Sequence, residues 1–424
     1  DHRIFSNYGA ISLGLGKLEE AEKWFRKAIE IKPDFEDAHY NLGNTLRDLG
    51  KLHEAELSTR KAIELDPNFP EYYNILGTIL RTKGNIKDAT ESFDKALNLN
   101  PNLINARKNL ANLKLLSGDY KSGWYHNTWR WKEKNSPLLN INVSTEKWKG
   151  NIFKKGDKLL VFSEEGLGHT IQYMRFIPFI RRQGVDISFV AEKKLHGLIQ
   201  ASRIDQCPLT FKQSVSVSEG RWIPLLSIAG ILGVSPEKPI ISTPYIYTKD
   251  KLVKKWENII NKDKRLIIGI NWQGNPKLER TQYRGRSIAL EDFSSLLCNN
   301  HMTMLSLQKG FGSEQLEHCS FKNKFIECQP QIDSTWDFLE NAAIIQNCDL
   351  IITCDSAIAH LAGAMGKKTW LLLKDIPWWT WGLVGENTFW YPSMRLFRQN
   401  ERHNWQEVME RVSIAITKEM KIND

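Results

Sequence analysis

The segment EEGLGHT (164–170) places carboxylates, an imidazole and two glycines within one short turn. Gly166 and Gly168 lack a Cβ, which lets the backbone come close to a ligand, and a following helix would present unpaired N–H groups. The segment matches neither a full GxGxxG pattern nor a P-loop. It predicts either a ligand-binding turn or a tight strand-to-helix turn that binds nothing.

A second segment of this kind is CDSAIAHLAGAMG (354–366). Asp355 and Ser356 can cap the helix that follows, and the first amides of that helix favour a diphosphate. His360 lies four residues after Ser356 and therefore on the same helix face. The alternative is an ordinary capped helix whose histidine is satisfied within the fold.

Basic side chains form a third group. Arg280, Arg284 and Arg286 share a glycine-containing loop, and Lys309 follows the apolar run MLSL. Arginine suits phosphate oxygens because its guanidinium is planar and permanently charged. A solvated basic loop is the alternative. The aromatic run at 375–399 fits packing of the C-terminal part better than stacking on a sugar.

Nothing in the sequence predicts a metal site. The six cysteines contain no CxxC pair, and no DxD occurs in the chain, so a metal-held nucleotide is disfavoured. This cysteine usage favours a reduced, cytoplasmic setting over disulfides or zinc. No apolar run approaches the ~20 residues that span a bilayer, and no signal peptide opens the chain.

The polar segments follow short apolar strands. We expect strands in KLLVF (158–162), VDISFVA (185–191), RLIIGINW (265–272), HMTMLSLQKG (301–310), CDLIITC (348–354) and KKTWLLL (367–373), and a helix over 171–184 kinked at Pro178. Strands alternating with helices predict parallel sheets, here in two α/β lobes joined near 245–262. Ligands bind at the carboxyl ends of such strands, where the polar segments lie.

The first part of the chain repeats with a period of 34 residues. Prolines recur at 33, 67 and 101, glycines at 16, 50, 84 and 118, and alanines at 21, 55 and 89 and at 28, 62 and 96. This pattern resembles the tetratricopeptide repeat, a helix pair that stacks into a solenoid. Units cover 2–35, 36–69 and 70–103, and a fourth starts at 104 and degenerates after Gly118. GWYHNTWRWK (123–132) is predicted to be a terminal helix, and further units upstream are consistent with the pattern.

The concave face of such a solenoid binds peptides or partner proteins. Asn7, Asn41 and Asn109 occupy one equivalent inner position, whereas Ile75 interrupts the series. This ladder resembles the asparagines that hold the acceptor polypeptide in eukaryotic O-linked N-acetylglucosamine transferases. The alternative, which we favour, is that asparagine is simply common at this repeat position.

Composition fits this division. The chain has 424 residues, 41% hydrophobic and 25% charged, which excludes wholesale disorder. Of a net charge of +9, residues 1–135 contribute 21 basic and 19 acidic side chains, so most of the excess lies in the α/β part. We assign that excess to a phosphate-bearing small molecule, because no nucleic-acid-binding motif appears. Six of the 15 tryptophans fall between Trp370 and Trp405.

Several motifs occur in order over 158–400. EEGLGHTIQYMRF, GINWQGNP, RGRSI, LSLQKG, DSAIAHLAGAMGKKTWLLL and WYPSMRLFRQ resemble bacterial glycosyltransferases related to the lipopolysaccharide heptosyltransferases, in the form fused behind tetratricopeptide repeats. The resemblance implies a GT-B fold and an inverting, metal-independent transfer from a nucleotide-diphosphate sugar, with no further cofactor. It implies the following donor-site positions: Gly166, Gly168, Trp272, Gly274, Asn275, Arg286, Ser287, Gln308, Lys309, Asp355, Ser356 and His360.

One position departs from the family pattern. The relatives read GLGD, and their aspartate is the presumed general base, whereas this chain has His169 there. An imidazole can take a proton near neutral pH. We predict that His169 is the base with Glu164 in support; Glu164 or Glu165 acting alone, or weakened catalysis, are the alternatives.

These observations predict a tetratricopeptide α-solenoid followed by a GT-B fold of two Rossmann-like lobes. The expected domains are 1–135, 136–250 on the acceptor side and 251–424 on the donor side. The expected function is sugar transfer to a hydroxyl on a protein recruited by the repeats, or on a glycan. The alternative is a repeat scaffold that binds proteins and carries a degenerate, nucleotide-binding domain.

Overall fold

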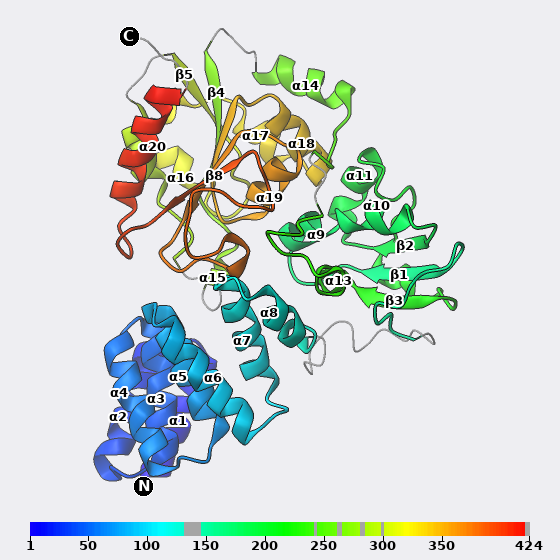
Figure 1. Cartoon of the computed structure of the whole chain (residues 1–424). Coiled ribbons are helices and arrows are strands. Elements are labelled where there is room, and N and C mark those ends of the chain that lie inside the picture. The colour runs from blue at the N-terminus through cyan, green and yellow to red at the C-terminus, as the bar shows by residue number, and fades with distance from the viewer. Residues whose placement is uncertain (131–145, 241–243, 261–264, 280–284, 298–300, 420–424) are drawn as a thin grey trace. The chain divides into compact units, whose positions relative to one another are not determined.

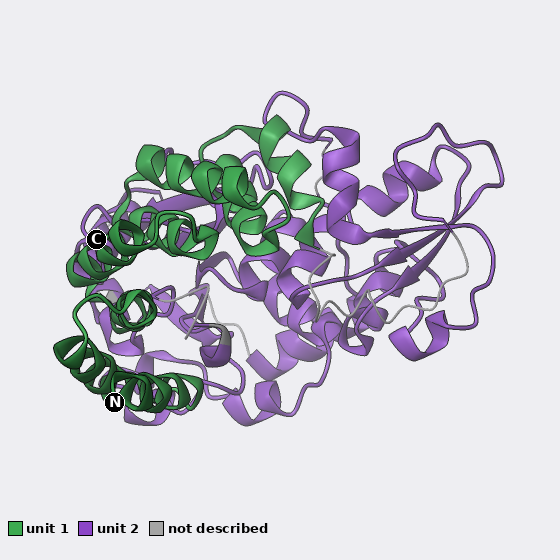
Figure 2. Cartoon of the chain, turned by 90° about the horizontal axis from the view of Figure 1, so that it is seen from below, with its two compact units in different colours: residues 1–134 green, residues 135–424 purple. Residues whose placement is uncertain are grey.

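The computed structural model describes residues 1–130, 146–240, 244–260, 265–279, 285–297 and 301–419. The chain divides into two compact units, Asp1–Lys134 and Asn135–Asp424, which Figure 2 shows in two colours. Within the described ranges, no helix is long and apolar enough to cross a membrane.

The described part of the first unit is a series of helices joined by short turns. They are α1 (His2–Gly14), α2 (Leu18–Ile31), α3 (Glu36–Leu49), α4 (Leu52–Leu65), α5 (Pro70–Lys83), α6 (Ile86–Leu99), α7 (Ile104–Leu116) and α8 (Tyr120–Asn127). Each odd-numbered helix packs against the even-numbered helix that follows it, and each pair packs against the next. This is the predicted solenoid of helix pairs.

Small residues at the repeat positions make this packing possible. Gly50 and Gly84 end their helices with φ of 82° and 89°, a left-handed conformation that favours glycine. At Gly77 an added Cβ would lie 2.7 Å from the Phe93 ring, so the two helices of that unit approach closely only with glycine there. Ala28 and Ala62 are fully buried. The 34-residue period therefore reflects contacts between helices.

The second unit begins with a three-stranded parallel sheet in the order β2-β1-β3. Its elements are β1 (Lys158–Phe162), α9 (Leu167–Tyr173), α10 (Phe176–Arg181), β2 (Asp186–Val190), α11 (Lys193–Ala201), α12 (Phe211–Ser214), β3 (Arg221–Pro224) and α13 (Leu225–Leu232). Leu159 pairs with Ile187 on one side and with Arg221 on the other. The four residues after Lys158 in β1 are buried, as a central parallel strand requires.

A five-stranded parallel sheet follows in the order β5-β4-β6-β7-β8. Its strands are β4 (Leu266–Asn271), β5 (Met302–Ser306), β6 (Leu350–Cys354), β7 (Thr369–Leu373) and β8 (Met394–Arg398). The α-helices around it are α14 (Asp250–Ile260), α15 (Pro276–Glu279), α16 (Gln315–His318), α17 (Gln329–Asp333), α18 (Phe338–Gln346), α19 (Ala357–Ala364) and α20 (Trp405–Glu419). The 3₁₀ helices are η3 (Leu290–Leu297), η4 (Lys322–Lys324) and η5 (Trp379–Trp381).

A hydrophobic core lies on one face of this second sheet. Alternate residues of β4, such as Ile268 and Ile270, pack with side chains of η3 and α20, and Trp272 continues the same cluster. Figure 1 shows α20 lying along the sheet. On the other side, α19 contacts β6 and β7. Repeats followed by parallel sheets with helices confirm the predicted fold class.

Two local details differ from the sequence-based expectation. The predicted kinked helix over 171–184 is two helices, α9 and α10, with a break before Phe176. Pro178 has no N–H to donate to the Met174 carbonyl, and the Ile177 N–H donates to that carbonyl instead at 3.1 Å. In addition, β3 and β8 were not predicted as strands. Each lies at the edge of its sheet; β3 has only four residues, and β8 carries Arg395 and Arg398.

Candidate active site

The turn between β6 and α19 offers a helix N-terminus at the carboxyl end of a central strand. The Ser356 hydroxyl accepts a hydrogen bond from the Ile358 N–H at 3.2 Å and so caps α19. The same hydroxyl donates to Asn271 Oδ1 at 2.6 Å, which ties the cap to the end of β4. The Ala359 N–H donates to the Ser356 carbonyl at 3.2 Å. The N-terminal end of α19 also carries the positive end of the helix dipole, which favours an anion.

Arg286 lies beside this turn. Its side chain is buried, Nη1 donates to the Asp355 carbonyl at 3.1 Å, and Nε lies 3.2 Å from Glu279 Oε1. Gly274 makes room for it, because an added Cβ there would lie 2.5 Å from Cζ of the guanidinium. The Gly274 N–H in turn donates to the Ser287 hydroxyl at 3.1 Å. The fold therefore brings four predicted positions together: Gly274, Arg286, Ser287 and Asp355.

Gln308 and Trp272 are buried and contact the segments that follow β4 and β5. Gln308 Oε1 accepts from Asn271 Nδ2 at 2.7 Å and from the Gln273 N–H at 3.0 Å. Trp272 is fully buried and donates from its indole to the Gly312 carbonyl at 3.0 Å. Their side chains thus hold the ends of β4 and β5 in place.

Lys309 and Asn275 lie at the edge of this group. Lys309 Nζ donates to Thr335 Oγ1 at 2.6 Å, and burial, with a smaller effect of Lys194, lowers the pKa of this ammonium. Asn275 is exposed, and its side-chain oxygen accepts from the Lys277 N–H at 3.0 Å. Arg280 and Arg284 lie outside the described residues.

The turn between β1 and α9 carries the other histidine. His169 is 8% exposed, and its Nδ1 lies 3.1 Å from Glu165 Oε2. Glu165 has φ of 60°, a strained value for a residue other than glycine. Glu164 instead accepts from the Leu226 N–H at 3.1 Å, where α13 begins. The carboxylate beside His169 is therefore that of Glu165, the residue after the predicted Glu164.

The two turns face one another within the second unit. An added Cβ at Gly168 would lie 2.8 Å from Cδ2 of His360, and the rings of His169 and His360 have centroids 6.3 Å apart. Trp378 lies near His169, with ring centroids 5.9 Å apart. Gly166 is the residue before α9 and is exposed. The structure therefore places His169, His360 and the N-terminus of α19 around one locus.

Burial shifts the pKa values of two titratable groups in this locus in opposite directions. It raises the pKa of the Asp355 carboxyl, an effect that Arg286 opposes. It also lowers the pKa of His360 well below its usual value, with smaller effects of His169 and Arg175 in the same direction. Both changes favour the neutral forms. The positive potential that an anion would meet then comes from Arg286, which is paired with Glu279, and from the N-terminal end of the α19 dipole.

Residues that the sequence did not single out complete the locus. Tyr391 Oη lies 3.0 Å from His360 Nδ1, and Trp381 stacks on the same imidazole. Both belong to the aromatic run at 375–399, and Trp379, Trp381, Trp390 and Tyr391 are buried. The packing interpretation therefore describes most of these rings. Which ring would meet His360 was not visible in the sequence.

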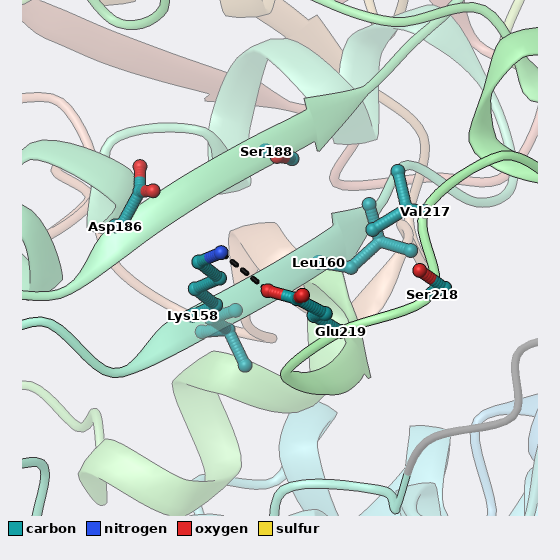
Figure 3. A pocket seen from close by; sticks show the side chains of 8 residues that line it. Lys158, Leu160, Asp186, Ser188, Val217, Ser218 and Glu219 are labelled. Carbon is teal, nitrogen blue, oxygen red and sulfur yellow. Dashed lines mark hydrogen bonds and ion pairs between the residues drawn. The ribbon is translucent and has the colours of Figure 1, made fainter.

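A cavity of about 240 Å³ lies elsewhere, near the amino ends of β1 and β2 (Figure 3). Lys158 and Glu219, both exposed, pair across it at 2.5 Å, and Asp186 and Ser188 line it. Lys158 and Asp186 begin their strands, whereas ligands of parallel sheets bind where strands end. We therefore place the candidate active site at the two facing turns.

The predicted asparagine ladder in the first unit is uneven. Asn7 is exposed, and Asn41 is half-buried. Asn109 donates to Asn74 Oδ1 at 2.9 Å, so its amide bridges two neighbouring repeats. Part of this side chain is therefore already engaged within the solenoid.

Among the described residues, no group of three or more histidine, cysteine, aspartate or glutamate side chains could hold a metal ion.

Family models match both units. A TPR repeat model matches residues 13–50, and tetratricopeptide repeat models match 36–69 and 70–103. Glycosyltransferase family 9 (heptosyltransferase) matches residues 320–373, which include β6, α19 and β7 and therefore Asp355, Ser356 and His360. These matches support a glycosyltransferase with tetratricopeptide repeats.

Protein FlbA of Caulobacter vibrioides is 22% identical over 328 residues, which are 72% of this chain and 54% of that protein. This chain thus spans about half the length of that curated relative. Among solved structures, MamA from Desulfovibrio magneticus RS-1 is 21% identical with a TM-score of 0.30, covering 32% of this chain and 78% of that one. TTC0263, a thermophilic TPR protein in Thermus thermophilus, is 18% identical with a TM-score of 0.31, covering 33% and 78%.

Proposed function

We propose that the second unit is a GT-B glycosyltransferase that moves a sugar from a nucleotide-diphosphate donor to an acceptor hydroxyl. The observation that carries this proposal is the pair of facing turns. One offers the N-terminus of α19 with Arg286 beside it, and the other offers His169. The match to glycosyltransferase family 9 over 320–373 supports the same conclusion.

The diphosphate would bind at the five-stranded sheet. Helix amides at a capped N-terminus attract anionic oxygens, and a guanidinium adds a full positive charge with planar geometry. Arg286 is held by Gly274 and the Asp355 carbonyl, so little side-chain freedom remains to be lost on binding. These groups neutralise the leaving diphosphate and would take the place of a metal ion.

Transfer would also require a base for the acceptor hydroxyl, on the side of the sugar opposite to the diphosphate. His169 takes the proton from the acceptor hydroxyl as that oxygen attacks the anomeric carbon. The bond from that carbon to the diphosphate oxygen breaks, and the nucleoside diphosphate leaves with the electron pair. Glu165, 3.1 Å from His169 Nδ1, orients the ring and stabilises the imidazolium that forms. A single displacement of this kind inverts the anomeric configuration.

The repeats would supply the acceptor. A solenoid of helix pairs presents an extended surface that suits a polypeptide, which favours a protein acceptor over a free glycan. Asn7 and Asn41 are candidate contacts, because the amide of Asn109 is shared with Asn74. A cytoplasmic location is consistent with the cysteines of the described residues, which are thiols rather than disulfides.

The alternative function is a repeat scaffold with a degenerate, nucleotide-binding domain. Its specific support is His169, which stands where relatives have aspartate. The two functions differ in turnover but not in nucleotide binding.

A panel of UDP-, GDP-, dTDP- and ADP-sugars tests the proposal. A thermal-shift screen identifies the nucleotide that stabilises the chain, and release of nucleoside diphosphate from the matching sugar measures turnover. We expect Arg286→Gln to lose the shift, whereas Arg395→Gln, which removes surface ion pairs with Glu386 and Glu419, keeps it. Binding without turnover in the presence of candidate acceptors favours the scaffold, and absence of binding to any nucleotide refutes both.

A further inference from the structure

His360 is held on one edge and one face by aromatic side chains. The residue is 4% exposed, and its Nδ1 lies 3.0 Å from Tyr391 Oη. The Trp381 ring stacks on the imidazole with centroids 5.1 Å apart and an interplanar angle of 26°. These contacts leave the ring almost no freedom to rotate or flip.

The opposite edge of the imidazole faces the other turn. An added Cβ at Gly168 would lie 2.8 Å from Cδ2 and 3.6 Å from Nε2 of His360. The ring nitrogen presented to the candidate active site is therefore Nε2. Whether this nitrogen carries a hydrogen decides whether it can donate to a ligand or accept from one.

The surroundings of Tyr391 limit the acceptors that its hydroxyl hydrogen can reach. Arg175 is 4% exposed, and its guanidinium carbon lies 4.7 Å from the Tyr391 ring. A guanidinium has donors and no acceptor, so the phenol hydrogen cannot point to it. The neighbouring Tyr245 hydroxyl accepts from Arg175 Nη2 at 3.0 Å and donates to the Ile171 carbonyl at 3.0 Å. Tyr391 also makes a hydrogen bond with Tyr245, so the acceptors within reach of the Tyr391 hydrogen are Tyr245 Oη and His360 Nδ1.

The fit of Tyr391 is specific to its site. At Gly363 of α19, an added Cβ would lie 2.6 to 3.0 Å from ring atoms of Tyr391. Glycine at this position therefore lets the phenol ring lie against the helix that carries His360. Tyr391→Phe keeps the ring and removes only the hydroxyl, so it leaves this packing intact.

We propose that Tyr391 is a positioning residue whose hydroxyl donates to His360 Nδ1 and thereby fixes the imidazole as the Nε2–H tautomer. His360 then presents a neutral donor to an oxygen of the donor diphosphate. That ligand rests on the proposed function, whereas the tautomer does not. Burial raises the pKa of Tyr391 and lowers the pKa of His360, which keeps the phenol protonated and the imidazole neutral.

This assignment separates the roles of the two histidines. His169, beside a carboxylate, accepts the acceptor proton, whereas His360 donates a hydrogen bond to the leaving group and keeps its proton. Two titratable groups in different surroundings commonly divide acid and base roles in this way. Tyr391 thus acts on the reaction only through His360.

The test measures the tautomer directly. The full chain is labelled with ¹⁵N-histidine, and the His360 imidazole is identified among the 10 histidines by its loss in His360→Gln. We expect Nε2 to have the shift of a protonated nitrogen and Nδ1 that of an acceptor nitrogen. In Tyr391→Phe we expect both shifts to move toward intermediate values, with about tenfold weaker binding of the nucleoside diphosphate. In the matched control Tyr247→Phe, which removes an exposed hydroxyl that donates to the Pro244 carbonyl, both ¹⁵N shifts should stay in place.

A protonated Nδ1 in the unmodified chain would overturn the proposal, and so would unchanged shifts in Tyr391→Phe. The spectrum is recorded without nucleotide, so its result does not depend on the proposed function. If Tyr391 fixes the tautomer but no nucleoside diphosphate binds, the proposed function is wrong and the positioning role of Tyr391 stands. If nucleotide binds and the tautomer is unaffected by Tyr391, the positioning role fails alone.

Discussion

The turns after β1 and after β6 have similar local architecture but different surroundings. Each follows a buried parallel strand, begins a helix and places a histidine in its first turns. In the first turn His169 lies beside the carboxylate of Glu165, whereas in the second His360 lies among Tyr391, Trp381 and Gly168. The comparison shows that a histidine on a turn acquires its chemical role from what packs against it.

The largest expected effect is that of removing the imidazole of the first turn. His169→Ala should reduce sugar transfer by about 10²- to 10⁴-fold, the usual contribution of a general base, while nucleoside diphosphate still binds. Turnover and calorimetric titration measure the two properties. His196→Ala, which removes a histidine bonded to the Ala191 carbonyl, is the control. Full turnover in His169→Ala would show that the two turns do not divide the chemistry as proposed.

The next effect concerns the contact between the turns. Gly168→Ala should cost about 1–3 kcal/mol in the free energy of unfolding, because the new methyl group would meet the His360 ring. Gly166→Ala is a matched control, since nothing lies within 4 Å of a Cβ there and its φ is −92°. Urea unfolding followed by tryptophan fluorescence measures both variants. Equal stability of the two would mean that the turns do not pack as described.

A smaller effect is the pH dependence that His360 confers. Its pKa is lowered by folding, so below the usual value of 6.5 the unfolded chain binds the proton more readily than the folded chain. Stability should therefore fall as the pH drops below 6.5, by up to about 1.4 kcal/mol per pH unit for one proton. The slope should be shallower in His360→Gln. Unfolding curves collected between about pH 5 and 7.5 compare the two chains, and identical slopes would contradict the assignment.

The smallest effect distinguishes the two glutamates of the first turn. Glu164→Gln weakens the acceptor at the start of α13 and should cost about 1 kcal/mol in the free energy of unfolding. Glu165→Gln should change stability less but lower kcat more, because it removes the carboxylate beside His169. Chemical unfolding and steady-state kinetics of both variants separate these outcomes. A larger kcat loss in Glu164→Gln would restore Glu164 as the partner of His169.

Much of the architecture was readable because periodic packing leaves a periodic sequence. The 34-residue spacing of glycine, alanine and proline predicted the helix pairs, and apolar runs such as LIITC predicted buried strands. Two strands left a weaker signal: β3 has only four residues, and arginines interrupt the apolar pattern of β8. The residues that gather at the carboxyl ends of strands were also predicted, because parallel strands bring their ends to one edge of a sheet.

What the sequence by itself determined is therefore the solenoid, the parallel strands and the polar turns that follow them. These features follow from local contacts and from hydrophobic periodicity, which neighbouring residues record. Glu165 and His169 are only four residues apart, so the local spacing already allowed their contact. Only the tertiary structure decided that Glu164 anchors α13 and that Tyr391 meets His360. Tyr391 and His360 are 31 residues apart, and Leu226 is 62 residues from Glu164. Such pairings depend on how whole elements pack, and no local spacing in the chain encodes them.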